Sequence, residues 1–427
     1  MKKIKIIIVG AGLRGFAYAD FALAHKEMYE VVAVAEPVKE RREKMQRLHH
    51  IPDDKCFHDW KPLLALPKFA DLAVISTMDD LHFEPCMEAI EKKYDILLEK
   101  PMAPRPKECL EIARAAEKNG VRIVVCHVLR FARFFEKLKE LIVSGRVGKI
   151  ATVVHTEGVG NIHQSHSFVR GNWKNSVESA PMILAKSCHD TDIIQWLVGK
   201  KCVKVQSFGS LSYFNRENKP KNSPERCIDG CPYADTCYYN AVELYLKDED
   251  NSWFRTAATM KTNPTNEDVE KALRETEYGK CVYSCSNDVV DHQVVNMEFE
   301  TGITASFTMS AFNKGGRQIR IMGTKGELYG DMENNYVSLY RFDTKETEKI
   351  MISDSVSKQD LTGGHSGGDA GLMEELYQYL TDSYHGFSIC EISETCDNHF
   401  ISFAAEKSRV DGGRVVDVKE YEESFSV

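Results

Sequence analysis

The chain has 427 residues, of which 43% are hydrophobic and 28% charged, and its formal net charge is −9. These values are typical of a globular protein of two or three domains, and an acidic chain without a basic run argues against a nucleic-acid-binding protein. No apolar run approaches the roughly 18 residues that a membrane span needs, and the first strand-like run begins without the features of a signal peptide. We therefore expect a cytoplasmic protein without nucleic-acid or membrane partners, and reduced thiols for most of its 13 cysteines.

An apolar, β-branched run at residues 4–9 leads directly into the glycine-rich turn GAGLRG. The first glycine permits a tight turn, the second lets the backbone approach a pyrophosphate, and the third lets the following helix pack close to the strand. The N–H groups at the start of that helix can then bind the anion. The residues that we assign to this part of a dinucleotide site are Gly10, Gly12, Leu13, Arg14 and Gly15.

An acidic residue, Glu36, ends the second apolar run at residues 31–35. Its distance from the glycine turn is the one at which dinucleotide-binding proteins carry the acid that binds the ribose. A carboxylate accepts hydrogen bonds from ribose hydroxyls and repels a 2′-phosphate, so the sequence predicts NAD as the cofactor. Arg41 and Arg42 follow closely and leave NADP as the less favoured alternative.

Strand-like runs alternate with helical stretches over the first part of the chain. The runs are residues 31–35, 72–76, 95–98 and 122–126, and the helical stretches include residues 84–93 and 107–119. This alternation predicts a parallel sheet with helices on both faces, which is a Rossmann domain over residues 1–126. Ligands bind at the carboxyl ends of such strands, where the glycine turn, Glu36, Thr77 and the pair Glu99-Lys100 all fall.

Several segments together resemble the Gfo/Idh/MocA family, the relatives of glucose-fructose oxidoreductase and inositol dehydrogenase. They are VGAGLRG, ISTMDDLHFEPCMEAI, ILLEKPMA and SCHDTDIIQWLVG, with the acid at Glu36. The resemblance covers essentially the whole chain apart from about residues 212–280. It implies an α/β protein with an N-terminal Rossmann domain and a C-terminal α/β domain, here residues 127–427, whose large, mostly antiparallel open sheet commonly forms an oligomer interface. We therefore expect a homodimer or homotetramer.

The resemblance also implies roles for individual residues. In that family the lysine of the EKP motif is catalytic and the histidine before the WL pair assists proton transfer, which points to Lys100 and His189. Thr77, His82, Glu99 and Lys100 match residues that line the nicotinamide and the ribose.

The chain departs from the family pattern at two places. Met78 follows the threonine where many relatives have proline, and Ala185 stands four residues before the histidine where many dehydrogenases have aspartate. The next residue is Lys186, which forms a K-x-x-H-D pattern with His189 and Asp190. We interpret this pattern as altered substrate chemistry and assign Lys186 to the substrate site.

The second half of the chain contains runs that alternate as strands with one exposed face do: residues 150–155, 203–210, 294–299 and 304–310. Between the first two lies HQSHSFVRGNW, which is dense in polar and aromatic residues. Placed over the nicotinamide, this loop would supply His166 and Arg170 as donors to hydroxyl groups and Trp173 as a stacking face for a sugar ring. The alternative is an ordinary surface loop.

A glycine-rich stretch, LTGGHSGGDAGLMEEL, surrounds His365 near the C-terminus. Glycines there would let His365 approach a ligand closely, so we assign it to the substrate site, with Asp369 as the N-cap of a helix at residues 372–380. A flexible surface loop is the alternative.

Residues 212–290 form a cysteine-rich insert. Cys227, Cys231 and Cys237 are closely spaced, and Cys281 and Cys285 follow. Thiolates at such spacing suit a closed tetrahedral zinc site, so we predict a structural zinc ion held by the first three cysteines and Cys281, with Cys285 as a substitute. An iron–sulfur cluster, free thiols or a disulfide are the alternatives.

Two functions are compatible with these features. The first is an NAD-dependent oxidoreductase that oxidises or reduces a secondary hydroxyl or ketone of a sugar, glycoside or cyclitol, with Lys100 stabilising the alkoxide and His189 taking the proton. The second is a glycoside-cleaving enzyme that uses tightly bound, recycled NAD and needs a further acid or base, for which Lys186, His166 and His365 are available. A non-catalytic NAD-sensing protein would have no use for Lys100 or His189.

Overall fold

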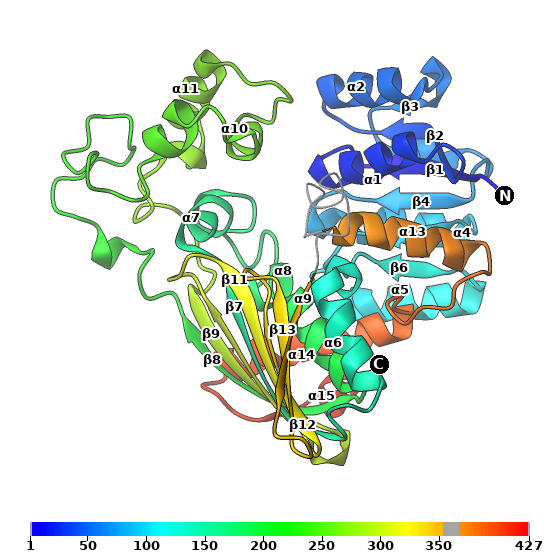
Figure 1. Ribbon diagram of the computed structural model, residues 1–427. Helices are drawn as coiled ribbons and strands as arrows, with labels where there is room; N and C mark the ends of the chain where they lie inside the picture. The colour runs from blue at the N-terminus through cyan, green and yellow to red at the C-terminus, as the bar shows by residue number, and fades with distance from the viewer. Residues whose placement is uncertain (1, 353–366, 426–427) are drawn as a thin grey trace.

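The computed structural model describes residues 2–352 and 367–425, which form two sheets that meet at a common junction (Figure 1). The first sheet has six parallel strands in the order β3-β2-β1-β4-β5-β6. This is the Rossmann order, which reverses between β1 and β4, so the predicted parallel sheet is confirmed. Its strands are β1 (Ile4–Val9), β2 (Tyr29–Ala35), β3 (Cys56–Phe57), β4 (Leu72–Ile75), β5 (Asp95–Leu98) and β6 (Ile123–Val125).

Helices cover both faces of this sheet, and the alternating side chains of β1 show why. Ile6 and Ile8 pack in one apolar cluster, while Ile7 and Val9 pack in another. Strands buried on both faces form continuous apolar runs, which is the pattern that made them visible in the sequence. The helices of this region are α1 (Leu13–Ala24), α2 (Lys39–His49), α3 (Trp60–Ala65), α4 (Phe83–Glu91) and α5 (Pro106–Asn119).

A helix from the far end of the chain also packs on the Rossmann sheet. Leu372, Met373 and Leu376 of α13 (Gly368–Leu380) lie in the same cluster as Ile6 and Ile8, and α13 runs across this sheet in Figure 1. The division into residues 1–126 and 127–427 does not anticipate this return, because the pattern of an amphipathic helix does not identify the sheet that it covers.

The second sheet has nine strands in the order β14-β13-β12-β11-β7-β10-β9-β8-β15. Among the described strands, β7 and β10 pair in parallel and the other neighbours pair antiparallel, so the predicted mostly antiparallel sheet is confirmed. The strands are β7 (Ile150–Gly158), β8 (Cys202–Ser210), β9 (His292–Phe299), β10 (Thr304–Ser310), β11 (Gly316–Gly323), β12 (Gly326–Asp331), β13 (Tyr336–Arg341), β14 (Thr347–Met351) and β15 (Val416–Asp417).

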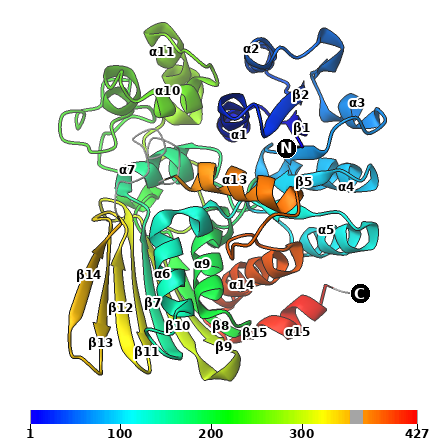
Figure 2. The same ribbon diagram turned by 45° about the vertical axis from the view of Figure 1, so that its right-hand side comes forward.

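Helices α6, α9 and α14 cover one face of the second sheet (Figure 2). Every residue of α9 is buried, because this helix lies between the sheet, α6 and α14. The helices of this part are α6 (Arg133–Val143), α7 (Asn161–His163), α8 (Met182–Ala185), α9 (Cys188–Val198), α14 (Ile392–Val410) and α15 (Val418–Glu423). Among the helices of residues 2–352 and 367–425, none combines the length and apolarity that crossing a membrane requires.

The cysteine-rich insert has a small apolar core of its own. Tyr245, Phe254, Val269, Leu273 and Tyr278 are buried against one another. They come from α10 (Ser252–Thr259), α11 (Asn266–Glu275) and the segments on either side. The sequence looks poor in apolar runs there because these side chains are scattered singly, yet their packing orders the insert.

Candidate active site

The glycine turn has the shape that a pyrophosphate needs. Gly10 has φ +93°, and a Cβ atom there would lie 2.7 Å from the Ser76 carbonyl oxygen. A Cβ atom on Gly15 would lie 2.1 Å from the Gly10 carbonyl oxygen, whereas one on Gly12 would meet no atom within 4 Å. Helix α1 begins at Leu13 with no side-chain cap and no acid in its first turn. Its first N–H groups are therefore available to an anion, and the turn fits a dinucleotide.

Glu36 is buried at the end of β2 and joins that strand to the glycine turn. Its Oε2 accepts a hydrogen bond from the Ala11 N–H at 2.7 Å, and its Oε1 accepts one from Val38 N–H at 2.8 Å. Arg42 donates to the carbonyl oxygens of Glu36 and Pro37. The Glu36 carboxylate thus lies beside the glycine turn, and ribose binding by Glu36 stays a prediction. The Arg42 side chain is engaged by backbone carbonyl oxygens.

Arg14 and Glu99 bind each other. Arg14 Nε donates to Glu99 Oε1 at 2.6 Å, and its two terminal nitrogens each donate to Asp369 at 2.8 Å. Tyr18 also donates to Glu99. Burial alone would raise the pKa of Glu99, but Arg14 holds it below its ordinary value. Arg14 therefore connects the start of α1 to the end of β5 and to α13. The roles of Arg14 and Glu99 in cofactor binding stay predictions.

His82 is fully buried between two loops at the same edge. Its Nδ1 lies 2.8 Å from the Pro101 carbonyl oxygen and its Nε2 lies 3.2 Å from that of Thr77. The Thr77 hydroxyl donates to the Leu81 carbonyl oxygen at 3.0 Å. His82 thus holds the loops after β4 and β5 together beside Lys100.

Lys100 reaches from the Rossmann edge into the second domain. Its Nζ donates to the Ala185 carbonyl oxygen at 2.8 Å. Ala185 ends α8, and His189 lies in the first turn of α9, only 3% exposed. The charge of Lys100 also acts on Cys188, the neighbour of His189. Both residues expected to be catalytic are therefore brought to one junction.

Lys186 belongs to a buried cluster of charges next to this junction. Its Nζ lies 3.5 Å from Glu157 Oε1. Arg317 donates to Glu157 at 2.6 Å and to both oxygens of Asp190 at 2.7 and 3.0 Å. His155 Nε2 lies 2.7 Å from Asp190 Oδ1. Two cations therefore face two carboxylates within the fold.

The pKa values in this cluster are shifted by burial and by its charges. Burial lowers the pKa of Lys186, with Glu157 opposing and Arg317 and Lys100 adding to the effect. Burial raises the pKa of Glu157. Burial would also raise the pKa of Asp190, but Arg317 holds it well below its usual range. Lys186 is thus the cation of this cluster whose proton is most readily lost.

Asp79 is a candidate site residue that sequence analysis missed. It is 5% exposed and accepts hydrogen bonds from Trp173 Nε1 at 3.0 Å and Ser179 Oγ at 3.3 Å. Burial raises its pKa, with His82 and Lys100 opposing. Its position just after β4, at the carboxyl edge of the sheet, was the available signal. Trp173 consequently joins the second domain to the Rossmann edge.

The two other side chains assigned to the polar loop pack against the cysteine-rich insert. His166 Nδ1 lies 2.9 Å from the Tyr245 hydroxyl, and its ring stacks on Phe254 with centroids 3.9 Å apart. Burial lowers the pKa of His166 to about 3. Arg170 donates to the carbonyl oxygens of Lys280 and Tyr239. These contacts favour a structural role, and substrate binding by His166 and Arg170 stays a prediction.

Two expectations concern the glycine-rich stretch near the C-terminus. His365 lies outside the described residues. Helix α13 begins at Gly368 with Gly367 as its N-cap, and Asp369 lies inside the first turn. The N-cap prediction for Asp369 is therefore wrong, because its carboxylate binds Arg14.

The four cysteines assigned to zinc line one small cavity of about 20 Å³ together with Arg170. Arg170 Nη2 lies 3.6 Å from Cys227 Sγ. Within residues 2–352 and 367–425, however, no group of three or more histidine, cysteine, aspartate or glutamate side chains could hold a metal ion. Zinc binding by Cys227, Cys231, Cys237 and Cys281 is therefore not supported, and a buried guanidinium beside the thiols disfavours an added cation.

Comparison with known proteins identifies the family to which this architecture corresponds. A model described as "Oxidoreductase family, NAD-binding Rossmann fold" matches residues 4–127, and one described as "Oxidoreductase family, C-terminal alpha/beta domain" matches residues 139–396. A protein named as an oxidoreductase, YteT of Bacillus subtilis (strain 168), is 24% identical over 406 residues, which are 87% of this chain and 88% of that protein.

A second relative has a different named activity. The 2,7-anhydro-N-acetylneuraminate hydratase of Escherichia coli (strain K12) is 26% identical over 194 residues, which cover 45% of this chain and 49% of that protein. Among solved structures, levoglucosan dehydrogenase in complex with NADH and levoglucosan has a TM-score of 0.71 and 15% identity. That match covers 98% of this chain and all of the other, and it shows a shared fold.

Proposed function

Because this chain belongs to the Gfo/Idh/MocA oxidoreductase family, we propose that it transfers a hydride between NAD and a secondary hydroxyl or ketone of a sugar, glycoside or cyclitol. The observation that carries this proposal is the contact of Lys100 Nζ with the Ala185 carbonyl oxygen, 2.8 Å away. It brings a cation from the cofactor edge to the segment that precedes His189.

The two residues have complementary tasks. Lys100 donates a hydrogen bond to the reacting oxygen and stabilises the negative charge that develops on it. His189 takes the hydroxyl proton during oxidation and returns it during reduction. Bound NAD would accept the hydride from carbon and could return it within one catalytic cycle.

The cofactor site favours NAD over NADP. The carboxylate of Glu36 would accept hydrogen bonds from the ribose hydroxyls and repel a 2′-phosphate. Arg42 is engaged by the carbonyl oxygens of Glu36 and Pro37 and offers that phosphate little compensation. The Arg41 side chain is also engaged within the protein, because its Nη2 donates to Met260 Sδ at 3.8 Å.

The substrate would lie between the Rossmann edge and the second domain. Trp173 donates a hydrogen bond to Asp79, and we expect its ring to stack on a sugar ring. The charge of Lys100 acts on Lys186, and we expect Lys186 to donate a hydrogen bond to a substrate hydroxyl. A carbohydrate is the substrate class that such aromatic and polar groups suit.

A second candidate function is the redox-neutral cleavage of a glycoside or anhydro sugar. Its support is the pairing of Lys186 with Glu157, because a lysine with a lowered pKa can act as the additional base. Oxidation at one ring carbon acidifies the adjacent C–H, and a base removes that proton. The group on the next carbon then leaves with the C–O bonding electrons, water adds to the double bond, and the ketone is reduced again. The hydratase relative is compatible with this route.

One experiment separates the two candidates. Purified protein is incubated with a panel of aryl glycosides, free sugars and cyclitols, with and without added NAD, while NADH and released aglycone are followed separately. NADH that accumulates in proportion to substrate supports the first function. Aglycone release without net NADH supports the second. Protein that binds NAD but gives neither product across the panel contradicts both.

We also propose that the protein is a cytoplasmic homodimer or homotetramer assembled through the second sheet. Side chains on its strands alternate in exposure, as Val153 at 0% and Val154 at 42% illustrate. Helices α6, α9 and α14 lie against one face of the sheet (Figure 2), and the partner would pack on the other face. Light scattering of the purified protein tests this, and a monomer at micromolar concentration contradicts it.

A further inference from the structure

His127 is a buried histidine that contacts His189. Neither candidate function assigns a role to His127. It follows β6 at the carboxyl edge of the Rossmann sheet and is 1% exposed. Its ring lies edge to face against that of His189, with centroids 6.5 Å apart and planes at 81°. On another side it contacts His399, with centroids 5.7 Å apart.

Both ring nitrogens of His127 lack a hydrogen-bond partner among the described residues. Burial lowers the pKa of His127 well below its ordinary value, and Arg130 and Lys100 add to this, with Glu99 opposing. The ring is therefore neutral, with one nitrogen that donates and one that accepts. Such an unsatisfied polar ring is unfavourable in a core that a phenylalanine would fill. Its presence here, beside Lys100 and His189, suggests a task in the site.

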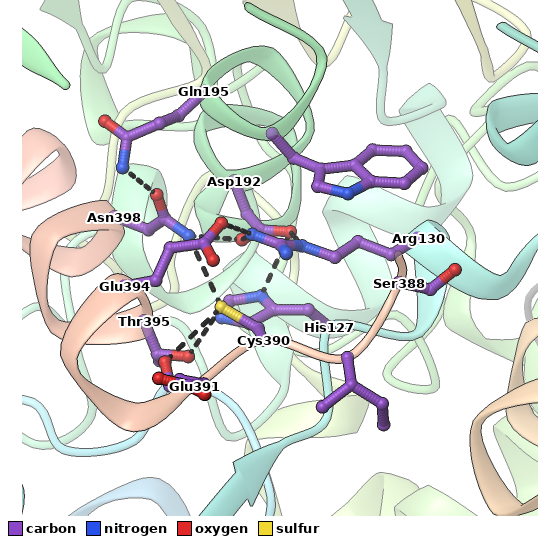
Figure 3. Close-up of polar contacts among 12 residues, drawn as sticks. His127, Arg130, Asp192, Gln195, Ser388, Cys390, Glu391, Glu394, Thr395 and Asn398 are labelled. Atoms are coloured by element: carbon purple, nitrogen blue, oxygen red, sulfur yellow. Dashed lines mark hydrogen bonds and ion pairs between the residues drawn. The ribbon is translucent and has the colours of Figure 1, made fainter. Parts of the chain in front are cut away.

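Asp192 selects the tautomer of His127. Its Oδ2 lies 3.7 Å from His127 Nδ1 (Figure 3). The Asp192 carboxylate is held in this orientation. Arg130 donates to both of its oxygens at 2.8 and 2.7 Å, and Asn398 donates to it as well. The negative charge of this carboxylate favours the tautomer with the proton on Nδ1, which leaves a lone pair on Nε2.

Both ring nitrogens of His399 already have hydrogen-bond partners, so His399 cannot donate to that lone pair. Its Nε2 accepts a hydrogen bond from the Met102 N–H at 2.9 Å, and its Nδ1 donates to the Thr395 carbonyl oxygen at 2.9 Å. The titratable or charged groups that act on His127 come from the loop after β5, from the turn Val128–Phe131, from α9 and from α14: they are Glu99, Lys100, Arg130, Asp192, His189 and His399.

We propose that His127 is a positioning residue for His189, with Asp192 fixing the tautomer in which it acts. The lone pair of the neutral ring and the carboxylate behind it stabilise the imidazolium that His189 becomes when it takes the hydroxyl proton. The positive charge of Lys100 would disfavour that imidazolium, and His127 offsets this effect. This inference rests on the proposed role of His189 as the base.

The test compares two variants of His127. His127→Phe retains a ring of similar size without nitrogens, and His127→Gln restores a polar group that can accept. The readout is the pKa of His189, measured by NMR on protein with labelled histidine, with the His189 signal assigned from its loss in His189→Gln. We expect His127→Phe to lower this pKa by about half a unit or more and His127→Gln to restore part of the shift.

Turnover with an active carbohydrate from the panel supplies the second readout. His127→Phe should lower kcat about tenfold, move the acid limb of its pH profile to lower pH, and leave KM and NAD affinity within about threefold. An unchanged pKa of His189 and an unchanged kcat in a folded His127→Phe protein would overturn the inference and make His127 a packing residue. Because the NMR titration needs no substrate, a shifted pKa in a protein without turnover would instead count against the proposed function.

Discussion

Lys100 Nζ lies 2.8 Å from the carbonyl oxygen of Ala185, the residue that stands where many related dehydrogenases have aspartate. A backbone oxygen therefore holds the ammonium group in this chain. A carbonyl oxygen orients the lysine without being able to take its proton, which leaves acid–base work to His189 and Lys186.

Replacement of Lys100 tests its role at the reacting oxygen. Lys100→Ala should leave NAD affinity within a few fold and lower kcat on the order of 100-fold or more, because the lost interaction acts mainly in the transition state. Steady-state kinetics and NAD titration measure the two quantities. Lys107→Ala, which removes an exposed lysine of α5 that pairs only loosely with Glu111, is the control. Equal turnover in both variants would remove Lys100 from the mechanism.

Replacement of Glu36 tests cofactor choice. Wild-type protein should bind NAD at least tenfold more tightly than NADP, and Glu36→Ala should reduce this ratio because the repulsion of the 2′-phosphate is lost. Fluorescence titration with both reduced cofactors measures the ratio. Equal affinity of the wild type for the two cofactors would show that Glu36 does not read the ribose.

Replacement of Lys186 separates the two candidate functions. Lys186→Gln keeps a polar side chain of similar length but cannot act as a base. If the protein cleaves glycosides, this variant should lose aglycone release by roughly 100-fold or more, while a single turnover of bound NAD to NADH persists. If the protein is a net dehydrogenase, NADH formation should change by less than tenfold. Loss of both activities together would place Lys186 in the hydride-transfer step itself.

The ion pair between Arg14 and Glu99 gives a prediction about stability and pH. Because the pKa of Glu99 in the folded protein lies below its ordinary value, the pair stabilises the fold above the unfolded pKa of about 4.3. This contribution is lost as the pH falls through the folded pKa. Arg14→Ala leaves two buried carboxylates, Glu99 and Asp369, without their cation and should cost roughly 3 kcal/mol at neutral pH.

Urea unfolding at pH 7 and near pH 4 measures this effect. The difference between wild type and Arg14→Ala should shrink at the lower pH, because buried Glu99 in the variant takes up a proton there and no longer needs a cation. Arg105→Ala breaks the exposed pair with Glu108 and should cost less than about 1 kcal/mol at either pH. A difference for Arg14→Ala that is the same at both pH values would contradict the assignment to Glu99.

Local sequence determined the elements that carry the cofactor site. The glycine turn, the acid at Glu36 and the lysine after β5 are recognisable because backbone conformation and strand periodicity depend on residues a few positions apart. The same reasoning predicted both sheets, since runs buried on two faces and runs buried on one face differ in their patterns.

Tertiary structure decided which distant groups meet. The grip of Arg14 on Asp369, the hydrogen bond from Trp173 to Asp79 and the contact of His127 with His189 each join segments that no local pattern relates. Packing also put His166 against Phe254 in the insert. The physical reason is that the partner of a buried polar group depends on how whole elements pack. The position of that group in the sequence does not identify this partner.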